Sequence, residues 1–254
     1  MSKVYVSVVS HGHFEIIEKI GCLSELSSKY DVVVKSNVRD DLLREYCALH
    51  GIYYLEGVTR KGFGENNNDV FSFCVNSLEM RENDYFLVLN PDVRISTDAV
   101  DLLVINMLSD NISFSTINLF KDDELTVYDN SIRRFPSLLN FLSSYLLRLN
   151  PSVIDKDGIK NKRIVDWAAG SFLMFKASVY KSVCGFDCRF FMYCEDIDIC
   201  LRLQRVGVCL MYYPDIKAVH YAMHKNRSVL SKHFFWHIRS IIRFLCVKNG
   251  WRFF

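Results

Sequence analysis

Runs of apolar and β-branched residues alternate with helix-like patterns through the first 120 residues, and this alternation restricts the possible folds more than any other feature of the chain. Between one strand-like run and the next, apolar residues recur with helical spacing. A β-α-β order of this kind predicts an α/β fold with a mostly parallel, doubly wound central sheet flanked by helices. The expected strands span 4–10, 31–37, 52–56, 84–90 and 112–120, and the expected helices span 14–29, 40–50, 67–78 and 97–107.

The alternation stops after residue 120. Residues 121–163 are polar apart from an apolar piece at 138–149. Strand-like runs return at 165–175 and 208–220, on either side of an expected helix at 195–205. The two parts of the chain therefore differ in organisation.

Composition excludes several protein classes. Half of the 254 residues are hydrophobic and only four are proline, which excludes disordered and low-complexity chains. No stretch reaches the roughly 18 consecutive apolar residues of a membrane span, and the first ten residues lack the apolar run of a secretory signal. The nine cysteines contain no C-x-x-C pair, and the spacing of Cys184, Cys188, Cys194 and Cys200 matches no common zinc pattern. We therefore expect buried, reduced thiols in a reducing compartment.

The C-terminal segment is basic and amphipathic. Residues 216–254 contain eight lysines and arginines and no acidic residue, whereas the preceding part is net acidic, which indicates an anionic partner for the tail. Residues 229–247 have the spacing of an amphipathic helix, which either lies in an anionic membrane interface or packs on the sheet with a solvated basic face. Its expected apolar face is Leu230, Phe234, Ile238, Ile241, Ile242 and Leu245, its basic face is Lys232, Arg239 and Arg243, and its aromatic anchors are Trp236, Trp251, Phe253 and Phe254.

Polar residues close the expected strands, and ligands of open α/β sheets bind beyond the carboxyl ends of strands. These strand ends carry Ser10, His11, Asn37, Asn90 and Asp92. The carboxylate of Asp92 follows a buried apolar run and is well placed to hold a divalent cation together with diphosphate oxygens. Taken alone, Asn90-Pro91-Asp92 is more typical of a turn.

An acidic cluster starts the expected helix at 195–205. The aromatic and apolar run 190–194 leads directly into Glu195, Asp196 and Asp198. A carboxylate in a half-buried pocket has a raised pKa and is usable as a general base. The helix dipole alone also explains acidic residues at a helix N-terminus. The residues themselves leave these two interpretations evenly matched.

A loop rich in glycine and asparagine precedes another expected helix. Gly62, Gly64 and Asn67 belong to this loop, and free N–H groups at a helix start are suited to bind an anion. The same residue types are ordinary in turns and helix caps.

Two later segments are compatible with a substrate site. Trp167 would pack on a sugar ring and Gly170 would let a ligand approach the backbone, although a core tryptophan is the more common case. His220 ends an expected strand and would complete a metal shell, and Arg227 would neutralise phosphate.

Taken together and in this order, the motifs resemble those of the family 2 glycosyltransferases with the GT-A fold. Within that family they are most similar to O-antigen L-rhamnosyltransferases that act on N-acetylglucosaminyl-diphospho-undecaprenol. The resemblance runs through nearly the whole chain, in the segments VSVVSHGH, GFGENNN, FLVLNPDV, SIRRFP, VDWAAGSF, GFD, FFMYCEDIDICLRL and HYAMHKNRS. It implies a GT-A-like domain over 1–228, with a nucleotide-sugar-binding half at 1–120 and an acceptor and catalytic half at 121–228, followed by a membrane-associating tail at 229–254.

The resemblance also implies roles for individual residues. Asp92 matches the last carboxylate of a D-x-D-like metal motif, and His220 matches a histidine near the metal. Asp196 matches the catalytic base, with Glu195 in support. The matches to the nucleotide-sugar pocket and the cleft are Ser10, Asn37, Gly62, Gly64, Asn67, Asn90, Asp92, Trp167, Gly170 and Arg227.

Two positions depart from the family pattern. Ser36 stands where the family often has an aspartate that contacts the nucleotide base, so base recognition would rely on other groups. Asn90 stands at the first position of the D-x-D-like motif, so metal binding would rest largely on Asp92 and His220.

The activity implied by the resemblance is an inverting, metal-dependent transfer of L-rhamnose in O-antigen and lipopolysaccharide biosynthesis. The donor would be dTDP-L-rhamnose, the cofactor Mg²⁺ or Mn²⁺, and the acceptor N-acetylglucosaminyl-diphospho-undecaprenol. The protein would be cytoplasmic and would bind the anionic inner face of the bacterial cytoplasmic membrane through its tail. A family member that transfers galactofuranose or an N-acetylhexosamine is the first alternative. A non-catalytic nucleotide- or nucleic-acid-binding protein is the second, supported only by the basic tail.

Overall fold

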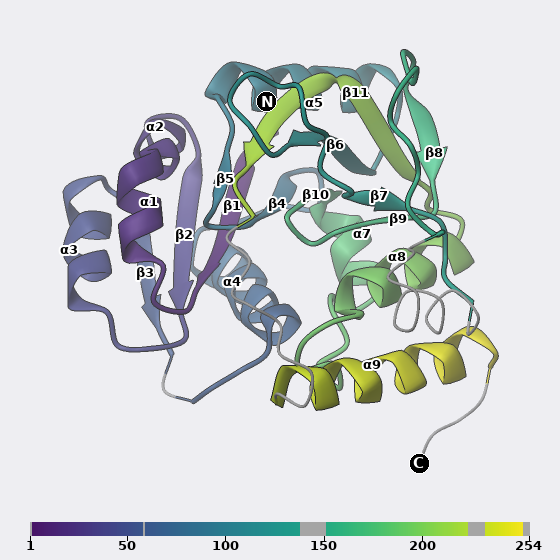
Figure 1. Ribbon diagram of the computed structural model, residues 1–254. Helices are drawn as coiled ribbons and strands as arrows, with labels where there is room; N and C mark the ends of the chain where they lie inside the picture. Colours follow the sequence, from purple (N-terminus) through teal and green to yellow (C-terminus); the bar gives the residue numbers. More distant parts are fainter. Residues whose placement is uncertain (1, 58, 138–150, 223–231, 251–254) are drawn as a thin grey trace.

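The computed structural model describes residues 2–57, 59–137, 151–222 and 232–250. A central mixed sheet is covered by helices on both faces (Figure 1). Within these ranges the sheet has the order β3-β2-β1-β4-β10-β6-β11-β5, with β8 paired to β11, and a second small sheet pairs β7 with β9. The strands are β1 Val4–Ser10, β2 Asp31–Ser36, β3 Tyr53–Glu56, β4 Tyr85–Leu89, β5 Val93–Arg94, β6 Phe114–Phe120, β7 Ile132–Arg133, β8 Arg163–Val165, β9 Trp167–Ala168, β10 Phe172–Lys176 and β11 Leu210–His220.

Most strands of the large sheet point the same way. β1 runs parallel to β2 and β4, β2 to β3, and β6 to β11, whereas β10 lies antiparallel between β4 and β6. The short strands β5 and β8 pair antiparallel with β11. The prediction of a mostly parallel sheet flanked by helices is therefore confirmed. Because β1, β4, β6 and β11 share one direction, their carboxyl ends lie along one edge, where a ligand site is expected.

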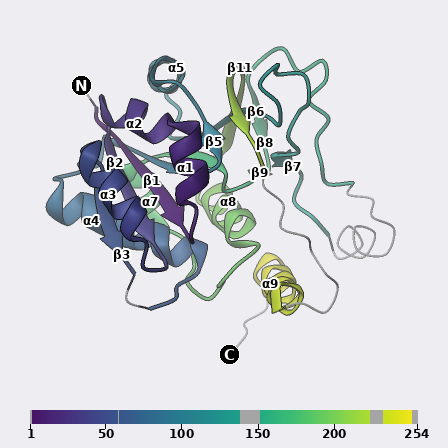
Figure 2. The same cartoon turned by 60° about the vertical axis from the view of Figure 1, so that its left-hand side comes forward.

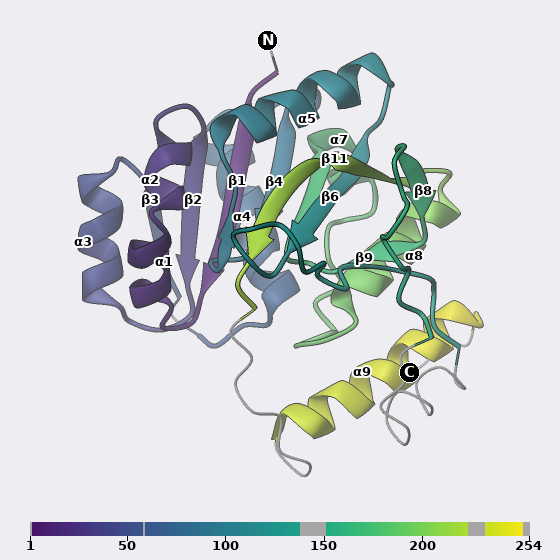
Figure 3. The same ribbon diagram turned by 45° about the horizontal axis from the view of Figure 1, so that its top comes forward.

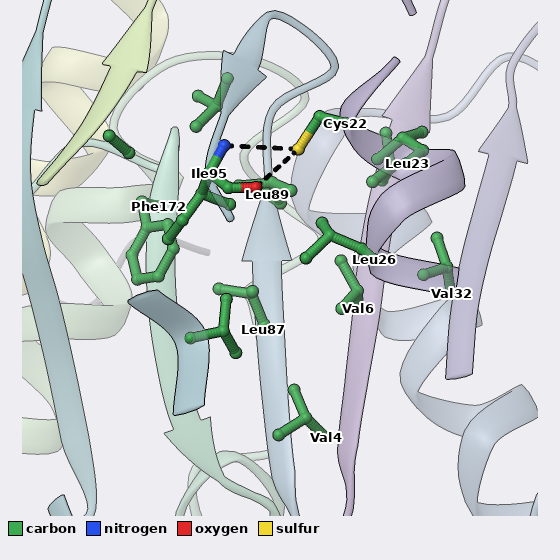
Figure 4. Packing of buried hydrophobic residues seen from close by; sticks show 14 of the residues in the cluster. Val4, Val6, Cys22, Leu23, Leu26, Val32, Leu87, Leu89, Ile95 and Phe172 are labelled. Atoms are coloured by element: carbon green, nitrogen blue, oxygen red, sulfur yellow. Dashed lines mark hydrogen bonds between the residues drawn. The ribbon is translucent and has the colours of Figure 1, made fainter. Parts of the chain in front are cut away.

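Two hydrophobic cores lie on the two faces of the sheet, since side chains alternate along each strand. Val4, Val6 and Val8 of β1 face the core covered by α1, α2, α3 and α5, which Figure 4 shows from close by. Tyr5 faces the core on which α4, α7, α8 and α9 pack. The helices are α1 Phe14–Ile20, α2 Cys22–Ser27, α3 Asp41–Leu49, α4 Phe63–Ser77, α5 Thr97–Ser109, α7 Ala177–Ser182, α8 Glu195–Arg205 and α9 Lys232–Lys248.

Local backbone chemistry explains where helices start and end. The single helix expected over 14–29 is two helices, because Gly21 adopts a left-handed conformation with φ of 66° and its N–H bonds to the Ile17 carbonyl. The side chain of Asp40 caps α3 by accepting from a backbone N–H, and that of Ser96 caps α5 in the same way. α4 starts at Phe63, earlier than expected.

The second half of the chain matches its prediction in part. The expected helix 195–205 is α8, and the expected strand 208–220 corresponds to β11. The run 165–175 divides into β8, β9 and β10, and the short helix α7 was not predicted. The apolar piece 138–149 lies outside the described residues.

α9 lies next to α8 at the carboxyl-end edge of the sheet, as Figures 1 and 3 show, and Figure 2 places it beneath α8. None of the helices in the described ranges has the length and apolar character to cross a bilayer. All nine cysteines are free. The expectation of buried thiols is wrong for Cys184, Cys188 and Cys209, which are exposed. Cys184 and Cys188 lie in turns between α7 and α8, and Cys209 directly precedes β11.

Candidate active site

A pocket of about 470 Å³ opens at the carboxyl-end edge of the sheet, and its volume falls in the range of small-molecule sites. Asn90, which follows β4, and His220, which ends β11, line its sheet side. The rest of the lining includes residues of β7 and β9, the start of α4, the start of α8 and one residue of α9. Figure 1 shows how these elements are arranged. The pocket therefore draws on both halves of the chain.

The carboxylate of Asp196 faces this pocket from the start of α8 and is held by the backbone. Its Oδ2 accepts a hydrogen bond from the Gly170 N–H at 3.2 Å, and its Oδ1 accepts one from the Ile197 N–H at 2.9 Å. Burial raises the pKa of Asp196. Burial and the charge of Asp196 together raise the pKa of the neighbouring Glu195 to about 8. Its two backbone hydrogen bonds place the Asp196 carboxylate to act as a base.

The backbone just before these carboxylates has an uncommon conformation. Tyr193 and Cys194 both have positive φ, 71° and 65°, although neither is glycine. α9 packs on this segment: the Ser240 hydroxyl donates to the Met192 carbonyl at 2.9 Å, and the His237 ring lies 4.9 Å from that of Tyr193. Strained backbone of this kind persists where surrounding contacts fix it, and it is common at functional sites.

His220 stands between two carboxylates at the end of β11. Its Nδ1 lies 2.7 Å from Asp129 Oδ2, and its Nε2 lies 3.4 Å from Asp92 Oδ1. Burial lowers the pKa of His220, but the hydrogen bonds to Asp129 and Asp92 outweigh burial and raise this pKa to about 9. Asp129 thus fixes the ring so that Nε2 faces Asp92.

With the Nε2 of His220 deprotonated, this arrangement fits a divalent cation that has few protein ligands. A metal-binding histidine commonly donates its other ring N–H to a carboxylate, as His220 would to Asp129. Mg²⁺ is usually held by one or two carboxylates together with substrate phosphates. In the described part of the chain, no three histidine, cysteine or acidic side chains converge on one metal position, so substrate oxygens would have to complete the shell around Asp92 and His220.

A cationic side chain also lines the pocket. Arg133 of β7 pairs in register with Trp167 of β9, and its guanidinium carbon lies 5.2 Å from the centre of the indole ring. Both residues line the pocket, and the charge of Arg133 lowers the pKa of Asp196, against the larger effect of burial.

Sequence similarity to known proteins extends over almost the whole chain. It is 40% identical over 250 residues to Rhamnosyltransferase WbbL of Escherichia coli strain K12, which covers 97% of this chain and 94% of that protein. The chain belongs to this rhamnosyltransferase family. It is also 30% identical over 178 residues to the N-acetylglucosaminyl-diphospho-decaprenol L-rhamnosyltransferase of Mycobacterium tuberculosis, over 66% of this chain and 57% of that protein. No family model matches the chain.

Solved structures support the fold of this rhamnosyltransferase. S. aureus TarS, in a crystal structure with UDP-GlcNAc, superimposes with a TM-score of 0.62 at 12% identity, over 97% of this chain and 66% of that one. A mycobacterial protein superimposes with a TM-score of 0.61 at 14% identity, over 99% of this chain and 76% of that one. The fold is GT-A-like, and together with its family membership this makes the protein a glycosyltransferase.

The pocket of this rhamnosyltransferase brings together predicted site residues that are far apart in sequence. Those that line it are Asn90, Trp167, Gly170, Glu195, Asp196 and His220. Asp92 joins them through its contact with His220. Arg227 lies outside the described residues. Metal binding by Asp92 and His220 and catalysis by Asp196 stay predictions.

Ser10 and Asn37, predicted for the nucleotide, lie at the ends of β1 and β2. Ser10 is buried, and its hydroxyl accepts from the His13 N–H at 3.2 Å. The Asn37 amide donates to the Lys61 carbonyl at 2.9 Å and accepts from Asn66 at 3.0 Å. These bonds tie the end of β2 to the loop before α4.

The predicted glycines bring the start of α4 against the segment that precedes α8. A Cβ at Gly62 would lie 2.0 Å from the Phe191 carbonyl oxygen, and a Cβ at Gly64 would lie 2.6 Å from the Phe186 Cβ. Asn67, further along α4, is fully buried, and its side chain bonds to β1. These contacts show a packing role, and nucleotide binding by the three residues stays a prediction.

Arg133 and His237 line the pocket and were not predicted as site residues. The adjacent arginines in SIRRFP were the available signal for Arg133. His237 falls in the tail that was expected to associate with a membrane, so only the packing of α9 reveals its place.

Proposed function

We propose that the protein transfers L-rhamnose from dTDP-L-rhamnose to N-acetylglucosaminyl-diphospho-undecaprenol by an inverting single displacement. The relationship to WbbL supports the transferred sugar, and a relative named for action on N-acetylglucosaminyl-diphospho-decaprenol supports the acceptor class. The observation that carries the proposal is one pocket that Asp196 and His220 line together. A base for the acceptor and a site for the donor diphosphate then share one cavity.

The carboxylate of Asp196 takes the proton of the acceptor hydroxyl. The hydroxyl oxygen attacks the anomeric carbon from the face opposite dTDP, and the bond between that carbon and the diphosphate oxygen breaks. The N–H groups of Gly170 and Ile197 orient the base, and burial together with the charge of Asp196 favours the protonated form of Glu195. Attack on the face opposite the leaving group inverts the configuration at the anomeric carbon.

Asp92 and His220 are the residues proposed to hold Mg²⁺ or Mn²⁺. When bound, the cation would neutralise negative charge on the leaving diphosphate. Asp129 keeps the His220 ring oriented, and Asn90 adds an amide at the same side of the pocket.

The nucleoside is proposed to bind along the carboxyl ends of β1 and β2, beside the pocket. Ser10 and Asn37 supply polar groups there, and Arg227 would pair with phosphate. Gly62, Gly64 and Asn67 would shape the wall formed by the start of α4. Trp167 and Gly170 would line the donor–acceptor cleft.

We further propose that residues 1–228 carry the transferase reaction, with the donor side in 1–120 and the acceptor side in 121–228. Residues 229–254 are proposed to bind the inner face of the cytoplasmic membrane.

α9 has one face buried against the rest of the protein and one face exposed to solvent. Ser240 is buried against the body, whereas Phe235, Ile238 and Ile242 are 62%, 37% and 49% exposed. Together with the exposed Arg239, this face suits an anionic lipid interface. Because α9 also borders the pocket, a membrane-anchored acceptor would find the site close to its lipid.

A transfer assay tests these proposals. The purified protein is incubated with a synthetic N-acetylglucosaminyl-diphospho-lipid and with dTDP-L-rhamnose, a UDP-galactofuranose or a UDP-N-acetylhexosamine, with and without EDTA, and products are identified by mass spectrometry and NMR. We expect one rhamnosylated product of inverted anomeric configuration, lost with EDTA and restored by Mg²⁺ or Mn²⁺. Transfer from another sugar nucleotide alone contradicts the donor, and full activity in EDTA contradicts the cation.

A further inference from the structure

Arg133 is held in a fixed position at the wall of the pocket. Its Nε donates to the Asn130 carbonyl at 2.9 Å, and its guanidinium lies over the Trp167 ring. Trp167 is itself locked, because it is 5% exposed and its indole N–H donates to the Arg134 carbonyl at 2.9 Å. A guanidinium stacked on a fixed aromatic ring presents its planar fork in one orientation, which is the form that binds phosphate oxygens.

A positively charged side chain at this place would offset the negative charge at one wall of the pocket. Glu195 and Asp196 contribute a buried carboxyl pair, and a diphosphate that approaches Asp196 would be repelled by it. Among the described residues that line the pocket, Arg133 is the one lysine or arginine. Its charge reaches Asp196, since it lowers the pKa of that carboxyl.

The diphosphates of the donor and of the acceptor are expected to bind at different positions in the pocket. The diphosphate of the donor belongs with Asp92 and His220 at the sheet side. The acceptor must bring its hydroxyl to Asp196, and it carries a diphosphate on the same sugar. The charge of Arg133 acts on Asp196, and the N–H of the neighbouring Arg134 donates to the Ser152 carbonyl, so Arg133 and Ser152 line adjoining parts of the pocket.

We propose that Arg133, stacked on Trp167, binds the diphosphate of the lipid-linked acceptor and thereby selects diphosphate-linked acceptors over neutral glycolipids. This inference rests on the proposed function. Arg133 would contact substrate, whereas Trp167 would be a positioning residue that keeps the guanidinium in place.

The test compares acceptor affinity in matched variants of the full chain. Arg133→Met removes the charge and keeps a side chain of similar length. Arg134→Met is the control, because Arg134 directly follows β7, is exposed and is absent from the pocket. Calorimetry gives Kd for an N-acetylglucosaminyl-diphospho-lipid, for the neutral glycoside with the same lipid, and for dTDP. Thermal melting confirms that each variant is folded.

We expect Arg133→Met to weaken binding of the diphosphate acceptor about 10- to 100-fold, as for loss of a charged hydrogen-bonding partner, and to change binding of the neutral glycoside and of dTDP less than about 3-fold. The affinity of Arg133→Lys for the diphosphate acceptor should lie between those of the wild type and Arg133→Met, because lysine keeps the positive charge but lacks the planar guanidinium fork. Arg134→Met should bind all three like the wild type.

Three results would overturn the inference. An equal loss for the diphosphate and neutral acceptors would make Arg133 a purely structural part of the wall. A loss for dTDP alone would assign Arg133 to the donor. The same loss of affinity in Arg134→Met would mean that the overall positive charge of the protein, and not the position of Arg133, determines acceptor binding. Each is distinct from failure of the proposed function, in which the wild type itself would not transfer rhamnose.

Discussion

Two backbone hydrogen bonds hold the Asp196 carboxylate in the pocket. A substitution by asparagine therefore removes the negative charge and keeps a side chain of similar size at the same position. In Asp196→Asn the amide oxygen can still accept from Gly170. We expect kcat to fall at least about 100-fold, because a positioned general base contributes about that much or more, while Kd for dTDP-L-rhamnose stays within about 3-fold. Single-turnover assays and calorimetry measure the two quantities. Asp215→Asn, an exposed carboxylate of β11, is the control, and turnover of Asp196→Asn at its level would exclude Asp196 as the base.

Glu195 makes the stability of the protein depend on pH in an unusual direction. Its folded pKa is raised to about 8 by burial and by Asp196, whereas in the unfolded chain it ionises near 4.5. Between these values the folded state holds a proton that the unfolded state releases, so the free energy of unfolding falls as pH rises through this window and recovers its full value only below the unfolded pKa. Raising the pH from 5 to 8 should therefore destabilise the wild type by about 3 kcal/mol more than it destabilises Glu195→Gln.

Urea denaturation at the two pH values measures this difference. Glu18→Gln, at an exposed position of α1, should follow the pH dependence of the wild type. If Glu195→Gln also runs parallel to the wild type between pH 5 and pH 8, Glu195 is ionised in the folded protein and the pair carries two charges.

At the residue scale, the sequence predicts what is local. Glu195 and Asp196 are adjacent, follow an aromatic run and start a helix, so the neighbouring residues are sufficient to predict their position. Asp129 was not predicted, because its contact with His220 spans 91 positions of the chain. Arg133 was missed for the same reason, since its ring partner Trp167 belongs to another strand.

At the element scale, intrinsic signals set most boundaries. The caps at Asp40 and Ser96 agree with the expected helix starts, since their side chains accept backbone N–H groups that would otherwise lack partners. The break at Gly21 was missed because the apolar spacing continues across it. Of the expected apolar face of the C-terminal helix, Ile238 and Ile242 are exposed, as contact with lipid would require, whereas Phe244, which was not assigned to that face, is fully buried.

The exposed face of α9 gives a test at this scale. Ile242→Asp places a negative charge on the face proposed to enter an anionic interface, and we expect flotation with vesicles of anionic lipid to fall at least about 10-fold because both apolar contact and charge attraction are lost. Ile105→Asp is a matched control, since Ile105 is 60% exposed on α5, away from α9 (Figure 1). An equal loss in both variants would mean that any added acidic residue has this effect.

At the scale of the whole molecule, the alternation of strands and helices predicts the class of fold but not the pairing. β10 lies between β4 and β6 in space although it follows β6 by more than fifty residues, and no local pattern carries such a contact. The environment of the C-terminal helix is equally hard to predict. An amphipathic helix has an apolar face, but the sequence does not say whether lipid or protein covers it. In the structure α9 covers α8 with one face and leaves another exposed.

Removal of residues 229–254 therefore separates two views of the tail. If the tail only anchors the enzyme, the shortened chain keeps full turnover on a water-soluble, short-chain acceptor. The contacts of α9 argue otherwise: Phe244 is fully buried, Ser240 bonds to the Met192 carbonyl beside the strained segment, and Arg205 donates to the Val247 carbonyl at 3.0 Å. We expect a lower melting temperature and at least about 10-fold slower turnover on the soluble acceptor, because loss of Phe244 alone costs about 3–5 kcal/mol. Ile242→Asp, which keeps these contacts, should lose vesicle binding and retain soluble turnover. Wild-type turnover of the shortened chain would show that α9 serves the membrane and not the pocket.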